Sequence, residues 1–393
     1  MSDSPAAKGS PDGPVLAIVL PDLIHASVTF FHEHIAAIWP GRTVVVHLSS
    51  TGERARTGVP VVEVAAPSPL PVPRLPLLGA LGRQLNVWRR SRIGRADRRR
   101  VADFLHEHRV THLFAEFAHV GATIAPLARR LGLPLTSMSH GYDINVLGEM
   151  PQWRLRYRRY FRSRARLVAV VPFLRERMGR IGAPPERVAI VPCAVEAADF
   201  PVIDQGRGPV RAAMVSRMVD QKGPLQSLRA FALARTARPE LTLDVVGNGP
   251  LMAAVEAEVD ALGIRDAVTL HHDQPHAVAL DVIGHAHLFL QHCMTVPRQG
   301  IESQGVSVVE AMGHGAVAIV TRHGGLTDHV AGGERGVAVD EGDVAGMARA
   351  IVAMVDDPAA RTRIGAAARA WVLATFSRAA VYPPLRDRIG LTA

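Results

Sequence analysis

The sequence predicts an α/β protein made of two domains, each built on a parallel β-sheet. Short apolar runs alternate with amphipathic segments along most of the 393-residue chain, and this alternation is typical of parallel sheets with crossover helices. A chain of this length is long for one core and suits two domains of roughly 150–200 residues. Apolar residues make up 48% of the sequence, which excludes a disordered protein.

The apolar runs predict strands in two groups. The first sheet is expected to contain Val15–Leu20, Thr43–Leu48, Thr111–Ala115, Leu135–Met138 and Leu167–Val171. The second is expected to contain Ala212–Ser216, Leu241–Val246, Val268–His271, Leu288–Gln291 and Ala316–Thr321. Between them, proline and glycine interrupt any regular element over Cys193–Gly208. We therefore predict an N-terminal domain over 1–197, a C-terminal domain over 198–372, and a helix over 373–393 that returns to the N-terminal domain.

A candidate binding residue follows one strand of the first sheet. The strand Leu135–Met138 leads into Ser139-His140-Gly141-Tyr142-Asp143, so His140 projects from the end of a strand. A lone histidine at such a place is more often structural than functional. Gly141 permits an unusual backbone angle, and Asp143 is suited to orienting its neighbours or capping the following turn.

A rare lysine follows the first strand of the second sheet. The chain has two lysines, Lys8 in the polar N-terminal tail and Lys222, among 45 basic residues. Lys222 comes five residues after Arg217, close to the end of the strand Ala212–Ser216. Open α/β sheets bind ligands at the carboxyl ends of their strands. An ammonium and a guanidinium together can neutralise a diphosphate, whereas the alternative is a surface lysine without a specific partner.

The next strand, Leu241–Val246, ends in Gly247-Asn248-Gly249-Pro250. The two glycines allow a tight turn, and Pro250 suits the first position of a helix expected over Leu251–Leu262. By itself this is a weak motif, because many turns from a strand to a helix look alike.

Two glutamates mark a short predicted helix near the end of the second sheet: Glu302 lies in the loop that enters it, and Glu310 lies near its far end. Seven residues separate Glu302 from Glu310, and a helix is expected over Val306–His314, ended by Gly315. The N-terminus of a helix attracts phosphate. A carboxylate on each side could accept hydrogen bonds from sugar and ribose hydroxyl groups, although the spacing alone fits two solvated glutamates equally well.

Together these motifs resemble the retaining glycosyltransferases of the two-domain GT-B fold, family 4 in particular. The signature of that family is a Glu, seven residues, a Glu followed by Ala-Met, a strand and a Gly-Gly turn. This chain has Glu302, Glu310-Ala311-Met312 and His323-Gly324-Gly325, with Ser303 where glycine is usual. His140–Asp143 is similar to an N-domain motif of bacterial exopolysaccharide transferases of this family. Ser27–Phe30 resembles their Ser-Glu-Thr-Phe segment, from which Val28 departs.

The resemblance implies two facing, doubly wound Rossmann-like domains with a cleft between them. It implies that Glu302 and His140 contact the donor sugar, with a hydrogen bond donated by the histidine, and that Glu310 holds the ribose. The base is expected against the backbone near His272–Gln274. The residues assigned to catalysis are His140, Arg217, Lys222 and Glu302. Those assigned to binding the nucleotide sugar are Gly247, Asn248, Gly249, His272, Gln274, Ser303, Gly305, Val306 and Glu310.

No metal or cofactor is expected. There is no Asp-x-Asp at a strand end, and pairs such as His271-His272 and His285-x-His287 lack the spacing of a zinc site. Two cations and a helix N-terminus would instead neutralise the diphosphate of a UDP-, GDP- or other nucleotide-sugar donor.

The positive charge is concentrated in the first half of the chain. Residues 1–200 hold 27 Lys and Arg against 16 Asp and Glu, whereas residues 201–393 hold 18 against 20. The excess lies in Arg83–Arg100 and in Trp153–Arg166, where Trp153, Tyr157, Tyr160 and Phe161 recur at helical spacing. These aromatic residues are more often core residues than membrane anchors. No nucleic-acid motif accompanies the arginines, which leaves a coding bias or an anionic membrane or lipid-linked substrate as explanations.

The expected compartment is the cytoplasm. Cys193 and Cys293 provide no disulfide framework, and neither a signal peptide nor a membrane span is visible. Peripheral association with the inner face of the membrane is consistent with the arginines.

The sequence therefore predicts a metal-independent retaining glycosyltransferase. Its acceptor would be a saccharide or a lipid-linked molecule in polysaccharide or glycoconjugate biosynthesis. Three alternatives remain at this point: a nucleotide-sugar epimerase of the same fold, a glycosyltransferase acting on a small-molecule acceptor, and a protein that binds nucleotide without turnover.

Overall fold

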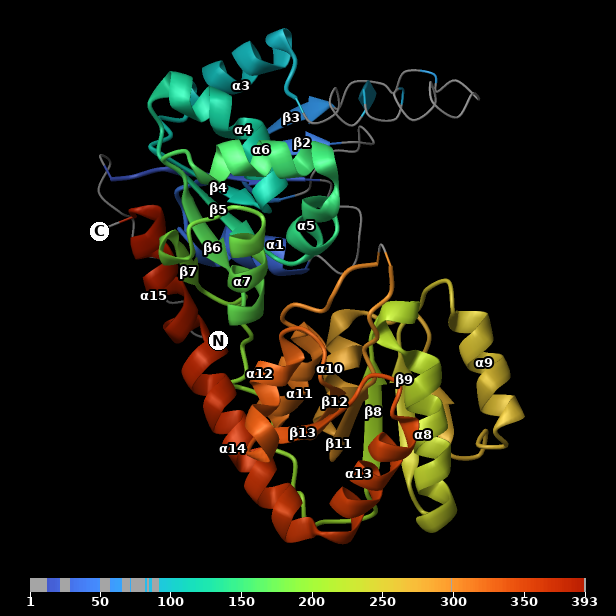
Figure 1. Cartoon of the computed structure of the whole chain (residues 1–393). Coiled ribbons are helices and arrows are strands. Elements are labelled where there is room, and N and C mark those ends of the chain that lie inside the picture. The colour runs from blue at the N-terminus through green and yellow to red at the C-terminus, as the bar shows by residue number, and fades with distance from the viewer. Residues whose placement is uncertain are drawn as a thin grey trace. The chain divides into compact units, whose positions relative to one another are not determined.

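The computed structural model describes residues 13–21, 29–49, 57–65, 71, 82, 85–86, 92–297 and 299–391. These residues form two compact units (Figure 1). The N-terminal unit comprises Met1–Val170, Leu174–Val191 and Tyr382–Ala393, and the C-terminal unit comprises Val171–Phe173 and Pro192–Val381. The main division thus lies between Val191 and Pro192, near the predicted boundary at 197.

The N-terminal unit is built on a parallel sheet with the strand order β3-β2-β1-β4-β5-β6-β7. Its strands are β1 (Leu16–Leu20), β2 (Thr43–Ser49), β3 (Val61–Ala65), β4 (His112–Glu116), β5 (Leu135–Ser139), β6 (Arg166–Ala169) and β7 (Val188–Ile190). The helices of this region are α1 (Thr29–Ala37), α3 (Arg95–Glu107), α4 (Ala118–Leu131), α5 (Tyr142–Asn145), α6 (Pro151–Phe161) and α7 (Pro172–Arg180).

The C-terminal unit is built on a second parallel sheet with the order β10-β9-β8-β11-β12-β13. Its strands are β8 (Arg211–Val215), β9 (Thr242–Val246), β10 (Val268–Leu270), β11 (Leu288–Gln291), β12 (Val317–Thr321) and β13 (Gly336–Val339). Its helices are α8 (Pro224–Ala237), α9 (Met252–Ala261), α10 (His276–Gly284), α11 (Val306–His314), α12 (Leu326–Val330), α13 (Val344–Asp356) and α14 (Pro358–Phe376).

The predicted fold class is confirmed, although the prediction of five strands in each sheet was too low. The sheets of the described chain have seven and six strands, because β3, β7 and β13 were not anticipated. All three lie at sheet edges; β3 alternates between buried and more exposed residues, and the two middle residues of β13 are partly exposed. Edge strands lack the continuous apolar run that marks a strand buried on both faces.

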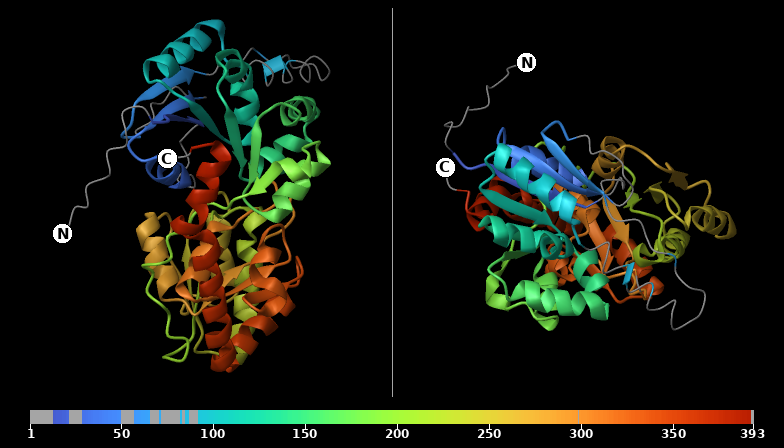
Figure 2. Two further views of the ribbon diagram at one scale, coloured as in Figure 1. Left: turned by 90° about the vertical axis from the view of Figure 1, so that its left-hand side faces the viewer. Right: turned by 90° about the horizontal axis from the view of Figure 1, so that it is seen from above.

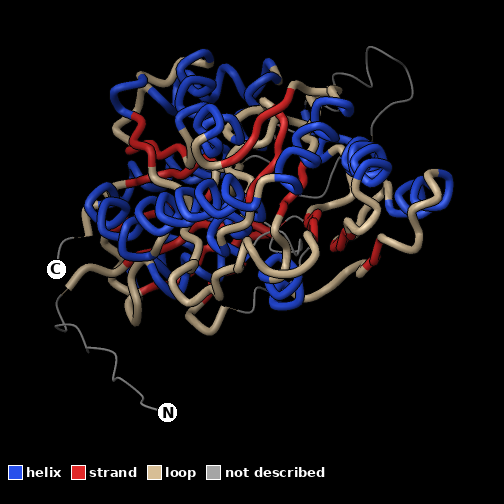
Figure 3. Tube along the Cα trace, turned by 90° about the horizontal axis from the view of Figure 1, so that it is seen from below, coloured by secondary structure: helices blue, strands red, loops and turns tan. Residues whose placement is uncertain are grey.

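Helices cover both faces of each sheet, and the central strands form the core. In Figure 3 the strands, drawn in red, lie among the helices, drawn in blue. Every residue of β1 and of β12 is buried. In the C-terminal unit α8 and α13 pack side by side (Figure 1), and α14, the long red helix of Figure 2, packs against α11.

In each sheet the strand order reverses at one point. The chain proceeds outward from β1 to β2 and β3, and then returns to the other side of β1 at β4. The second sheet reverses in the same way between β8 and β11. Ligands of doubly wound proteins bind where the order reverses, outside the carboxyl ends of the strands.

The C-terminal helix α15 (Arg378–Ile389) contributes its second half to the N-terminal unit. There Tyr382 donates a hydrogen bond from its hydroxyl group to Glu33 at 2.8 Å. Arg386 caps the end of α1 by donating to the carbonyl oxygens of Ile38 at 2.7 Å and Ala37 at 2.9 Å. A guanidinium near a helix C-terminus satisfies carbonyl groups that have no partner within the helix.

The aromatic residues of α6 belong to the core. Trp153, Tyr157, Tyr160 and Phe161 are all buried, at 5%, 0%, 4% and 0% exposure, so the alternative of aromatic membrane anchors on this helix was wrong. The exposed apolar side chain of α6 is Leu155. Among the described helices, none has both the length and the apolar character needed to cross a bilayer.

Candidate active site

The predicted donor-binding residues lie on loops at the carboxyl edge of the C-terminal sheet. Lys222 follows β8, the segment Gly247–Gly249 follows β9, and Glu302 lies between β11 and α11. The loops after β8 and β11 therefore flank the point where the strand order reverses. Parallel strands bring these loops together although up to eighty residues separate them in sequence.

Lys222 and Glu302 form an ion pair. The Lys222 ammonium contacts Glu302 Oε2, and the two side chains are 15% and 14% exposed. Glu302 Oε1 accepts hydrogen bonds from the backbone N–H groups of Ser303 at 3.1 Å and Gly305 at 3.2 Å. Burial opposes both charges, yet each partner stabilises the other, so the pKa of Lys222 is raised and that of Glu302 is lowered.

Glycines allow the loops around this pair to approach closely. Gly223 directly follows Lys222 with φ = 57°, and a Cβ atom there would overlap the carbonyl oxygen of His292. Gly324, with φ = 54°, similarly lies against the carbonyl oxygen of Glu302. Both residues need a left-handed conformation that favours glycine. The backbone on either side of the ion pair is thus fixed by neighbouring main chain.

His323 holds the backbone of Glu302. Its side chain is fully buried, and its Nε2 accepts a hydrogen bond from the Glu302 N–H at 2.9 Å. The other ring nitrogen, Nδ1, must then carry the proton, which it donates to Glu341 at 2.7 Å. Burial opposes the charge of Glu341, but hydrogen bonds from His323 and Thr295 lower its pKa. The two hydrogen bonds that link Glu341 to His323 and His323 to Glu302 fix the position of the Glu302 main chain.

The helix α11 begins beside Glu302, as predicted. Gly305 adopts a left-handed conformation with φ = 61° before the first turn, and Gly315 ends the helix with φ = 86°. The backbone N–H groups of Val306 and Ser307 donate to no other group among the described residues. Unpaired N–H groups at a helix start attract an anion.

Glu310 lies on the same helix and is buried. It accepts a hydrogen bond from His276 Nε2 at 2.7 Å, and its side chain is 8% exposed. This hydrogen bond raises the pKa of His276. His276 begins α10 and was not anticipated, because nothing in the sequence connects it to a residue 34 positions away.

The turn after β9 packs against the loop after β8. A Cβ atom at Gly247 would overlap the carbonyl oxygen of Ser216, and one at Gly249 would crowd Met218. The Met218 N–H donates a hydrogen bond to the carbonyl oxygen of Asn248 at 2.9 Å. The Gly247 N–H donates to the carbonyl oxygen of His272, also at 2.9 Å. Pro250 lies before α9, which begins at Met252, so its predicted place as the first helical residue was wrong.

Other predicted residues are less constrained. Arg217 is exposed at the start of the loop after β8, and its charge acts on Lys222. Gln274 donates a side-chain hydrogen bond to the His271 carbonyl oxygen at 2.7 Å. His272 adopts an unusual φ of 49°. Ser303 is buried.

In the N-terminal unit, His140 follows β5 as predicted and forms part of a buried cluster. Its Nε2 lies 2.6 Å from Oε2 of Glu116, the last residue of β4. Asp143 accepts hydrogen bonds from three backbone N–H groups: Ala118 at 2.7 Å, Gly141 at 3.1 Å and His140 at 3.3 Å. Asp143 therefore orients its neighbours as expected. Of the predicted Ser27–Phe30 segment, Ser27 and Val28 lie outside the described residues.

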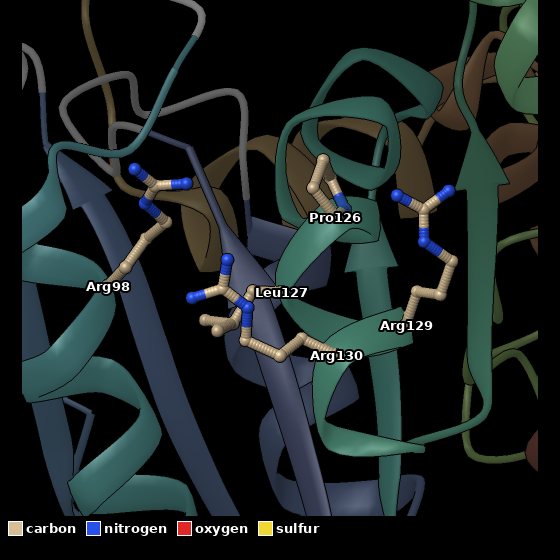
Figure 4. A pocket seen from close by; sticks show the side chains of 5 residues that line it. All are labelled: Arg98, Pro126, Leu127, Arg129 and Arg130. Atoms are coloured by element: carbon tan, nitrogen blue, oxygen red, sulfur yellow. The ribbon is translucent and has the colours of Figure 1, made fainter.

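A large arginine-lined cavity opens between α3, α4 and α6 in the same unit. Its volume is about 1360 Å³, and none of the described residues that line it is acidic. Figure 4 shows a smaller pocket next to it, lined by Arg98 of α3 and by Pro126, Leu127, Arg129 and Arg130 of α4. Burial and the charge of Arg92 lower the pKa of Arg156 to about 10. Part of the predicted Arg83–Arg100 cluster lies outside the described residues.

No group of three or more His, Cys, Asp or Glu side chains suited to a metal ion occurs within the part of the chain that the structure describes. Cys193 and Cys293 are both buried, and neither takes part in a disulfide.

Comparison with known families agrees with this geometry. The pattern described as "Glycosyl transferases group 1" matches residues 198–371. The pattern described as "Glycosyltransferase Family 4" matches residues 41–199. The chain belongs to the family 4 glycosyltransferases and is a glycosyltransferase of the GT-B fold class.

Named relatives are glycosyltransferases of glycolipid and polysaccharide synthesis. The chain is 26% identical to a GDP-mannose-dependent α-(1-6)-phosphatidylinositol monomannoside mannosyltransferase of Mycolicibacterium smegmatis, over 70% of this chain and 75% of the relative. It is 22% identical to the amylovoran biosynthesis glycosyltransferase AmsK of Erwinia amylovora, over 63% of this chain and 61% of AmsK.

A similar solved structure is that of HepE from Anabaena in complex with UDP. It has a TM-score of 0.76 and 15% identity, and the match covers 96% of this chain and 99% of HepE. At this identity the similarity shows the fold.

Proposed function

We propose that this enzyme transfers a sugar from a nucleotide-diphosphate sugar to a hydroxyl group, with retention of anomeric configuration and without a metal ion. The observation that carries the proposal is the Lys222–Glu302 ion pair, which lies at the strand-order reversal of the C-terminal sheet. An ammonium, a carboxylate and the start of α11 together suit a sugar joined to a diphosphate.

In the proposed reaction the acceptor hydroxyl oxygen forms a bond to the anomeric carbon. The bond from that carbon to the diphosphate oxygen breaks, and the hydroxyl proton passes to a phosphate oxygen on the same face. The products are the glycoside and a nucleoside diphosphate. The acceptor attacks the same face of the sugar from which the leaving group departs, so the anomeric configuration is retained. The reaction requires no nucleophile from the enzyme.

The positive groups act on the leaving diphosphate. Its negative charge grows as the glycosidic bond breaks, so Lys222, Arg217 and the N–H groups of Val306 and Ser307 stabilise the transition state more than the bound donor. These groups supply the positive charge that a metal ion would otherwise provide. Glu302 and His140 position the sugar, and Glu310 positions the ribose.

Donor turnover tests this proposal. Incubation with UDP-, GDP- and ADP-sugars should release nucleoside diphosphate in the presence of chelator, and the product should retain the donor's anomeric configuration. An epimerase would alter the donor sugar without acceptor transfer, and a protein that only binds nucleotide would release nothing. The relatives point to polysaccharide or glycolipid acceptors.

Variants at the two glutamates test the division of roles. Glu302→Gln should lose turnover while keeping its affinity for free nucleoside diphosphate, because Glu302 is assigned to the sugar. Glu310→Gln should weaken that affinity. If both variants bind free nucleotide equally well, these assignments are wrong.

For the N-terminal unit we propose association with anionic membrane lipids at the cytoplasmic face, which would bring the enzyme to a lipid-linked acceptor. The support is the arginine-lined cavity, whose exposed members include Arg159 and Arg162, together with the exposed Leu155. Each arginine near an anionic surface contributes about 1 kcal/mol, so Arg159→Gln with Arg162→Gln should weaken vesicle binding roughly 30-fold.

Vesicles of phosphatidylglycerol and of phosphatidylcholine distinguish this attraction from nonspecific adsorption. Binding should require the anionic lipid and should weaken as salt rises. Arg349→Gln with Arg363→Gln is a matched control, because it removes two exposed charges from the C-terminal unit. Equal binding to neutral vesicles, or equal losses in both double variants, would contradict the proposed membrane surface.

A further inference from the structure

Glu116 is a buried carboxylate held between two histidine rings. Its side chain is 0% exposed. Oε1 lies 2.5 Å from His34 Nδ1, and Oε2 lies 2.6 Å from His140 Nε2. The three residues come from α1, the end of β4 and the loop after β5, so tertiary folding alone brings them together.

Burying a carboxylate costs free energy, so the position of Glu116 in the core needs an explanation. A charge removed from water is tolerated when both oxygens receive strong hydrogen bonds. Here each oxygen contacts one imidazole nitrogen. Although burial opposes the charge, these contacts lower the pKa of Glu116 to about 2, so the carboxylate is ionised at neutral pH.

An ionised carboxylate only accepts hydrogen bonds, and this fixes which ring nitrogens carry protons. Nε2 of His140 and Nδ1 of His34 must both be protonated to donate to Glu116. The His140 ring is also packed against aromatic side chains, with centroids 4.4 Å from that of Phe30 and 4.9 Å from that of Phe117. Its orientation and its proton position are therefore set from one side by Glu116.

We propose that Glu116 is the positioning residue for His140. It holds the ring in one orientation and keeps the proton on Nε2. Because that proton is donated to Glu116, it is not available to the sugar, which corrects the expectation that His140 donates a hydrogen bond to the donor. Glu116 does not touch the substrates itself. This inference rests on the proposed function, which gives His140 a contact with the donor sugar.

A double-mutant cycle tests whether Glu116 acts through His140. A small misplacement of a positioned group costs on the order of 100-fold in rate, so Glu116→Gln and His140→Ala should each lower kcat/KM by one to two decades. The double variant should be no worse than His140→Ala alone, because Glu116 has nothing left to position. Affinity for free nucleoside diphosphate should not change in any of the three.

Glu63→Gln is a matched control. Glu63 lies on β3 and also accepts a hydrogen bond from a histidine of this unit, His47 Nδ1 at 2.6 Å. The substitution Glu63→Gln should leave kcat/KM unchanged. Losses that add in the double variant, or full activity in Glu116→Gln while His140→Ala is impaired, would overturn the role of Glu116. Full activity in His140→Ala would instead overturn the role that the proposed function gives to His140.

A spectroscopic measurement covers the case in which Glu116→Gln folds poorly. The ¹⁵N resonances of the His140 ring in the wild-type enzyme should show protonated Nε2. Neutral glutamine accepts or donates, so in the variant the proton should distribute between the two nitrogens. A wild-type ring protonated on Nδ1 alone would refute the proposal without any activity assay.

Discussion

Lys222→Arg keeps the charge at the proposed diphosphate site and changes its shape. The Lys222 side chain is only 15% exposed and already contacts Glu302. The main chain after it cannot withdraw, because Gly223 packs directly on the carbonyl oxygen of His292. A planar guanidinium is larger than an ammonium and donates in a fixed fork, so we expect it not to reproduce this contact.

The magnitude follows from what the lysine is proposed to do. Loss of one donor aimed at developing negative charge costs on the order of 3 kcal/mol, or about two decades of kcat. Lys222→Ala should show this full loss, and Lys222→Arg a large part of it. Lys222→Ala also leaves the Glu302 carboxylate without its cation, which costs 3–5 kcal/mol in a fully buried pair. Because this pair is partly exposed, we expect on the order of 1–3 kcal/mol of stability to be lost.

Stability and catalysis are separated by removing both charges. Lys222→Met with Glu302→Gln keeps the volume of the pair without leaving a lone charge, so thermal unfolding should return toward wild type while turnover does not. Release of nucleoside diphosphate at saturating donor gives kcat, and calorimetry gives Tm. Near-full activity in Lys222→Arg would show that Lys222 only screens charge and does not contact the diphosphate as proposed.

Three further outcomes are expected. His323→Phe removes the acceptor for the Glu302 N–H, so it should lower kcat with little change in nucleotide affinity. An unchanged kcat would show that the loop containing Glu302 keeps its conformation without this hydrogen bond. Gly223→Ala should unfold or severely destabilise the C-terminal unit, measured by Tm, because its Cβ atom meets main chain. Finally, the pKa of Glu116 is about 2 when folded against an ordinary value of 4.5. Its ionised form therefore stabilises the fold above pH 4.5, and the stability difference between wild type and Glu116→Gln should disappear as the pH falls toward 2.

Local sequence signals determined much of the fold. Strands buried on both faces are continuous apolar runs, so the central strands of both sheets were predicted within a few residues. The helix Val306–His314 was predicted from its own residues, since Gly315 provides the left-handed conformation that ends it. Of the edge strands, β10 was predicted but β3, β7 and β13 were not, because a partly exposed strand of three to five residues carries little signal.

The candidate site was predicted in part, for a related reason. Arg217, Lys222 and Glu302 stand at strand ends, and the topology of a parallel sheet brings strand ends together. The contacts that each of these side chains makes cannot be predicted from any short segment of the sequence. That Lys222 pairs with Glu302 depends on loops eighty residues apart in the chain.

The supporting histidines were decided by tertiary structure alone. His323, His276 and His34 contact Glu302, Glu310 and Glu116 across separate elements. A histidine in sequence shows neither its burial nor which nitrogen carries the proton. Both depend on hydrogen-bond partners that only the packed chain supplies, because burial makes an unpaired polar group costly and so selects the contacts that satisfy it.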